Sequence, residues 1–141
     1  MDVFYLAVRR MFLCFVLGLA ISTAEADVPK LLPLRFVVIN GTEDDLTCQA
    51  LAGRWYSFEL GSEGPGERLT FDMSLDAATD TVSMFNKARV AVPIETLYCG
   101  YRGRAWETHF EFPLHRIANE AARQGGLTLT CRSAGSALIC G

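Results

Sequence analysis

Cysteine placement is the strongest constraint on how this chain folds. Four of the five cysteines lie beyond residue 40, and the fifth, Cys14, lies in an apolar N-terminal run. An even number of cysteines in a small exported domain predicts two disulfides, for which three pairings exist. Such bridges help a short chain whose single core is modest in size. The cysteines concerned are Cys48, Cys99, Cys131 and Cys140.

The sequence near the C-terminus favours one of these pairings. Gly135-Ser136, between two apolar segments, is typical of a type II′ two-residue turn. With that turn, Cys131 lies directly opposite Cys140 at a non-hydrogen-bonded position, where Cα atoms are about 4.5 Å apart and a disulfide can form. Cys48 then pairs with Cys99. A shifted hairpin register would reopen the other pairings.

The first 26 residues have the order of a secretory signal peptide. Arg9-Arg10 precede the apolar run 11–22, and a small-residue cleavage site follows at 24–26. The apolar run is too short to remain in a bilayer as an anchor. We therefore expect cleavage of residues 1–26 and a periplasmic or extracellular location. Because Arg-Arg-Met-Phe-Leu also resembles a twin-arginine export signal, the export route stays open.

The expected mature chain, residues 27–141, forms one disulfide-stapled β domain without an integral membrane segment. The full chain has 13 basic and 16 acidic residues and a net charge of −3. The signal segment holds as many basic as acidic residues, so the mature chain keeps this balance. A chain without a basic excess is not drawn to nucleic acid, and we expect no nucleic-acid partner.

Alternating apolar and polar residues predict a mostly β fold. Pro93 favours an edge position for its strand. A single amphipathic helix is predicted at about 113–123, where Pro113 suits the first turn and Gly125-Gly126 ends the helix. These elements predict a small antiparallel β-sandwich, or alternatively a barrel. The expected strands are 35–40, 46–49, 54–60, 68–75, 81–85, 90–98 and 106–112, followed by the hairpin 127–140.

The same alternation predicts which side chains form the core. Aromatic and long aliphatic residues that share a strand face bury the most apolar area, each contributing about 1.5 to 3 kcal/mol. In the strand expected at 106–112, Trp106, Thr108, Phe110 and Phe112 form one row. The expected core consists of Tyr56, Phe58, Leu69, Phe71, Met73, Trp106, Phe110 and Phe112.

The segment 98–106 is the strongest candidate for a binding surface. Tyr101, Arg102 and Arg104 flank a glycine-containing turn, and Trp55 would join them if its strand lies nearby. Tyrosine, tryptophan and arginine dominate interface hot spots, and a turn held by a cystine at Cys99 loses little entropy on binding. The alternative is a hairpin tip whose arginines merely face solvent or pair with Glu95 and Glu107.

A metal site is the second hypothesis. On a strand, Glu107, His109 and Glu111 would project from one face at intervals of roughly 7 Å. With a ligand from a neighbouring strand, this row could hold Zn²⁺ or another divalent ion in a metal-binding protein or metal-dependent enzyme. The same row equally fits the solvated face of a strand whose other face is aromatic.

Signatures of other chemistry are absent from the sequence. It contains no Gly-x-Ser-x-Gly elbow, its mature cysteines are expected to be oxidised, and the glycines at 61–66 are not followed by the lysine and helix of a phosphate-binding loop. We expect no cofactor, and an enzyme is the less favoured interpretation. The favoured hypothesis is an exported module that binds a protein or envelope partner.

Overall fold

The structure is a computed structural model that describes residues 30–54 and 56–141, so the expected signal peptide and Trp55 lie outside the described residues. Strands dominate this part of the chain, together with two helices. The strands are β1 (Leu31–Asn40), β2 (Leu46–Ala52), β3 (Tyr56–Glu63), β4 (Arg68–Asp76), β5 (Thr81–Phe85), β6 (Ala91–Pro93), β7 (Thr96–Tyr101), β8 (Phe110–Glu111), β9 (Leu127–Ala134) and β10 (Ala137–Cys140), and the helices are α1 (Ala105–Thr108) and α2 (Leu114–Gln124).

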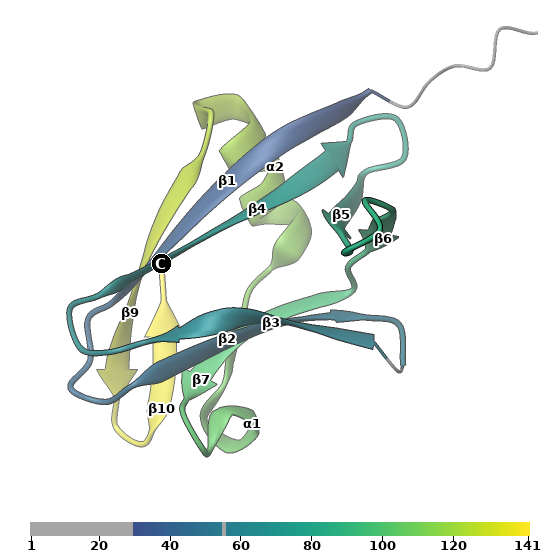
Figure 1. The fold of residues 1–141 in the computed structure, drawn as a ribbon. Helices are drawn as coiled ribbons and strands as arrows, with labels where there is room; N and C mark the ends of the chain where they lie inside the picture. The colour runs from purple at the N-terminus through teal and green to yellow at the C-terminus, as the bar shows by residue number, and fades with distance from the viewer. Residues whose placement is uncertain (1–29, 55) are drawn as a thin grey trace, which may run out of the picture.

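The strands form two facing sheets, so the predicted sandwich-like fold is confirmed (Figure 1). One sheet has six strands in the order β10-β9-β1-β4-β5-β6, and the other has four in the order β3-β2-β7-β8. Neighbouring strands are antiparallel except β1 and β9, which run parallel. This parallel pair differs from the predicted antiparallel arrangement. Along the chain, α2 and all four strands of the smaller sheet lie between β1 and β9. Pro93 lies in the edge strand β6, as expected.

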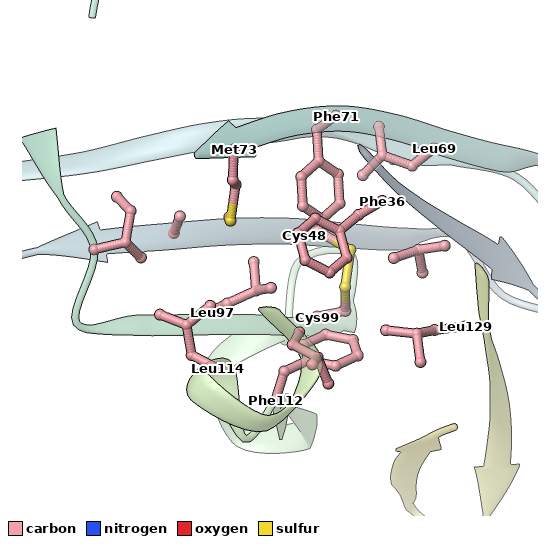
Figure 2. Packing of buried hydrophobic residues seen from close by; sticks show 14 of the residues in the cluster. Phe36, Cys48, Leu69, Phe71, Met73, Leu97, Cys99, Phe112, Leu114 and Leu129 are labelled. Atoms are coloured by element: carbon pink, nitrogen blue, oxygen red, sulfur yellow. A yellow bond between two sulfur atoms is a disulfide. The ribbon is translucent and has the colours of Figure 1, made fainter. Parts of the chain in front are cut away.

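The core lies between the sheets and follows the period-2 pattern of β1 and β4. Phe36 pairs with Phe71 across these strands, and their rings stack with centroids 5.5 Å apart. The adjacent pair Arg35 and Asp72 lies on the opposite, solvent-exposed face. Figure 2 shows Phe36 and Phe71 packed with Phe112 and other buried side chains.

Both predicted disulfides are present. Cys48 and Cys99 are directly opposed on β2 and β7, with Cα atoms 4.1 Å apart, and their bridge lies in the core (Figure 2). Cys131 and Cys140 are opposed on β9 and β10, with Cα atoms 4.0 Å apart. Two disulfides indicate an oxidising environment outside the cytoplasm.

The predicted helix is α2, which closes the core beside the four-stranded sheet. It buries Leu114, Ile117, Ala118 and Ala121 against β1, β5 and β9. Gly125 ends it in the left-handed conformation, with φ 75°. Among the residues that the structure describes, no helix is both long and apolar enough to cross a membrane.

The strand expected at 106–112 is wrong. The chain reverses at Gly103, which has φ 80°, and Ala105–Thr108 forms the single helical turn α1 before the two-residue strand β8. The Thr108 hydroxyl closes this turn because it donates to the Arg104 carbonyl at 2.9 Å and accepts from the Tyr101 N–H at 2.9 Å. A single turn followed by a short strand mimics the alternation of one longer strand.

The predicted core is correct in part. Leu69, Phe71, Met73 and Phe112 are buried, and Phe58 and Phe110 are partly buried against the core. Tyr56 is exposed because it lies at the tip of the β2–β3 hairpin. Trp106 is 66% exposed because α1 carries it to the outside of the four-stranded sheet.

Buried Asn40 connects the loops at the end of β1. Its side-chain amide donates to the carbonyls of Asp44 (2.8 Å) and Glu63 (3.0 Å). Its side-chain carbonyl accepts from the N–H and hydroxyl of Thr42. Asn40-Gly41-Thr42 matches a glycosylation acceptor pattern. Asn40 is nevertheless only 1% exposed, and its side-chain NH₂ group already donates two hydrogen bonds. These bonds join the β1–β2 loop to the end of β3.

We predict that Asn40→Ala lowers the free energy of unfolding by about 2 to 4 kcal/mol, because it leaves several buried polar groups without partners. Denaturant titration measures the change. Asn119→Ala, at an exposed position on α2, is the matched control and should shift stability by no more than about 0.5 kcal/mol. Equal effects of the two substitutions would contradict the role assigned to Asn40.

Candidate binding surface at the turn after β7

The candidate turn, residues 101–104, connects β7 to α1 and contacts two other parts of the chain. The Arg102 N–H donates to the Asp45 carbonyl at 2.8 Å, which joins the turn to the β1–β2 loop. The Tyr101 hydroxyl shares a 2.7 Å hydrogen bond with the hydroxyl of Ser133 on β9. Figure 1 shows this end of β7 beside α1 and the β9–β10 hairpin. The turn is therefore fixed from both sides.

Tyr101 has a different role from the one expected. Only 5% of it is exposed, and its ring belongs to the core cluster. It pairs with Leu46 on β2, two positions from the pair of Cys48 with Cys99, so its side chain shares the core-facing side of the sheet. Tyr101 anchors the turn and does not present its ring to a partner.

Gly100 allows α1 to pack directly on β7. A Cβ atom at this position would lie 2.7 Å from the Cα of Ala105, closer than side-chain carbons approach backbone. The opposing atoms belong to backbone, which cannot move aside as a flexible side chain does. Glycine is therefore required here for close approach, and α1 is held at one position on the sheet.

Arg102 and Arg104 are exposed, as the sequence predicts for a binding surface. The Arg102 guanidinium lies 3.6 Å from the Asp45 carboxylate, with both side chains more than half exposed, so the ion pair contributes little to stability. The Arg104 guanidinium carbon lies 5.8 Å from the centroid of the Tyr101 ring, in a cation–π arrangement. Both cations are loosely oriented by neighbours and remain accessible.

The two arginines line one side of a shallow depression of about 440 Å³. Glu43, Asp44 and Asp45 line its other side. Close to this loop, burial raises the pKa of the Glu63 carboxyl, and hydrogen bonding and repulsion from Glu67 raise it further. Here the surface places basic and acidic groups side by side.

A larger depression of about 620 Å³ lies on the outside of the six-stranded sheet, away from the turn. Its walls include Leu31, Pro33 and Phe85, with the ion pair of Arg35 and Asp72. The hydrogen bond and the charge of Asp72 raise the pKa of Arg35. Because this pair neutralises itself, the depression offers no net charge to select a ligand.

The structure does not bring the predicted metal row together as a strand face. Glu107 lies on α1, His109 follows α1, and Glu111 lies on β8. His109 Nδ1 donates to the Trp106 carbonyl at 2.5 Å, which orients the imidazole locally. Residues 30–54 and 56–141 contain no group of three or more histidine, cysteine, aspartate or glutamate side chains that could hold a metal ion. The strand geometry on which the metal hypothesis depended is wrong.

Trp106 is exposed on the surface, whereas its predicted position was in the core. Its ring stacks on His109 with centroids 4.8 Å apart and meets Tyr98 edge-on at 5.8 Å. The sequence contains only a weak signal for α1, which is Gly103 followed by the helix-favouring residues Ala105 and Glu107. The predicted contribution of Trp55 stays a prediction, since Trp55 lies outside the described residues.

No protein-family model, curated protein or solved structure matches this chain.

We predict that Gly100→Ala displaces α1 and lowers the free energy of unfolding by about 2 kcal/mol or more, since the new Cβ overlaps backbone. Thermal or denaturant unfolding measures the loss. The control is Gly64→Ala, whose Cβ would meet only flexible side chains, Glu67 at 3.4 Å and Asp45 at 3.7 Å. The role assigned to Gly100 would be wrong if both variants were equally stable.

Proposed function

We propose that this protein is an exported binding module, acting in the periplasm or outside the cell, that engages a protein partner through Arg102 and Arg104. The observation that carries the proposal is the combination of exposed cationic side chains with a fixed backbone. Tyr101 is anchored in the core immediately before them, and α1 begins immediately after them. The Cys48–Cys99 disulfide lies two residues before Tyr101.

A fixed turn favours binding because little backbone entropy remains to be lost. Ordering a flexible side chain at an interface costs about 0.5 to 1.5 kcal/mol, and ordering a loop adds to this. In this turn the N–H groups of Arg102 and Arg104 already donate to Asp45 and Tyr101. The partner therefore has to order only the two guanidinium groups, which can each form paired hydrogen bonds with a carboxylate.

The charge pattern indicates an acidic partner surface. Arg102 contacts Asp45 only at 3.6 Å and in solvent, so a carboxylate of the partner can replace Asp45 at small cost. The acidic loop at 43–45 then repels carboxylates that approach out of register. Attraction at the arginines together with repulsion at the loop would orient the partner.

The test is capture of partners from the native envelope or medium by the wild-type protein and by the Arg102→Glu/Arg104→Glu variant. We expect the variant to lose the captured partner and to bind the purified partner at least about 30-fold more weakly, because hot-spot residues contribute about 2 kcal/mol or more. Trp55→Ala, tested separately, should weaken binding if Trp55 joins the surface.

The matched control is Lys87→Glu/Arg116→Glu, which makes the same change in net charge at exposed positions on other elements. Lys87 lies between β5 and β6, which Figure 1 draws away from α1. The control variant should bind the partner like the wild type. If the control loses the partner equally, or the Arg102→Glu/Arg104→Glu variant retains it, the turn is not the binding surface.

A further inference from the structure

The outer face of the four-stranded sheet carries a second surface of different chemistry. Glu59, Gln49, Tyr98 and Glu111 form one line across β3, β2, β7 and β8, each directly opposite the next. Opposed residues of neighbouring strands share a face. Because Cys99, next to Tyr98, faces the core, this line faces outward.

Aromatic rings cover the centre of this line. Tyr98 is only 6% exposed although it lies on the outer face, because Trp106 and His109 pack over it with ring centroids 5.8 and 5.6 Å away. The Tyr98 hydroxyl donates to the side-chain carbonyl of Gln49 at 2.7 Å, which fixes the ring. Trp106 lies above this layer and is 66% exposed. We call Tyr98, Trp106 and His109, with Gln49, Glu59 and Glu111, the aromatic face.

The charge around the rings is negative. Glu59 and Glu111 are exposed at the two ends of the line, and exposed Glu107 is adjacent to Trp106 on α1. The guanidinium of nearby Arg104 lies over the ring of Tyr101, whose side chain is on the other, core-facing side of β7. An exposed indole with carboxylates around it combines the two attractions that select a cation, which are the π face and the opposite charge.

We propose that the aromatic face binds a cationic segment of a polypeptide, with an arginine or lysine side chain placed over the Trp106 ring and the flanking cations near Glu111 and Glu59. Tryptophan is the best cation–π partner among the side chains, and its anchoring on Tyr98 and His109 limits the entropy lost on binding. This inference is independent of the proposed function, because it uses different side chains and requires a partner of opposite charge.

The test uses an octapeptide of alternating arginine and glycine, a matched peptide with citrulline in place of arginine, and a hexasaccharide of N-acetylglucosamine. Titration calorimetry gives affinities, and NMR follows the indole N–H of Trp106. We expect the arginine peptide to bind and to shift the Trp106 signal, Trp106→Ala to weaken binding about ten-fold, and the citrulline peptide to bind at least about ten-fold more weakly. Trp106→Phe, which keeps a ring, should lose about three-fold, and it decides the result if the alanine variant fails to fold.

Carboxylate controls separate this surface from general attraction to an acidic protein. Glu111→Gln should weaken binding of the arginine peptide about three- to five-fold, whereas Glu120→Gln, which removes a charge from α2, should leave it nearly unchanged. Arg102→Glu/Arg104→Glu should not weaken binding of the arginine peptide. Failure of this inference can therefore be distinguished from failure of the proposed function. The inference would be overturned if Trp106→Ala left binding of the arginine peptide unchanged, or if both glutamine variants lost the same affinity. It would also be overturned if the protein bound the hexasaccharide in place of the arginine peptide.

Discussion

The Cys48–Cys99 disulfide is the constraint on which the rest of this structure depends. It joins residues 51 apart in sequence at the centre of the four-stranded sheet, and it lies in the core between that sheet and the six-stranded one. Closing a loop of this length contributes about 3 to 5 kcal/mol by the chain-entropy estimate. It also sets the register of β2 against β7, and through that register the core-facing side of Tyr101 and the outward side of Tyr98.

Two surfaces of opposite charge follow from the way α1 packs on β7. Close contact at Gly100 holds α1 against the sheet, with Arg104 at its start and Trp106 within it. Arg104 lies over the ring of core-facing Tyr101, whereas Trp106 lies over outward-facing Tyr98. One helical turn thus separates the proposed arginine surface from the proposed site for a cationic segment, and the module could engage an acidic and a basic partner region together.

Local patterns predicted the elements whose side chains obey a simple period. The alternation at 68–75 corresponds to β4, and the Gly135-Ser136 turn gave the observed register and disulfide of the last hairpin. The alternation at 106–112 wrongly predicted a strand. The contacts that fix α1 instead join Thr108 to Tyr101 and Gly100 to Ala105, and an alternating pattern carries no information about either contact. Burial of Tyr101 was available from the sequence: with Cys99 facing the core, the residue two positions on shares its face. The parallel pairing of β1 with β9 had no local signal.

Backbone order at residues 102–104 tests the central claim, that the arginine turn is fixed before any partner binds. NMR relaxation gives order parameters for the three amides in the free protein, with β4 as the rigid reference. Values near about 0.85, equal to those of β4, are the predicted result. Values below about 0.6 would show a turn that moves freely on the picosecond-to-nanosecond timescale and would contradict the account.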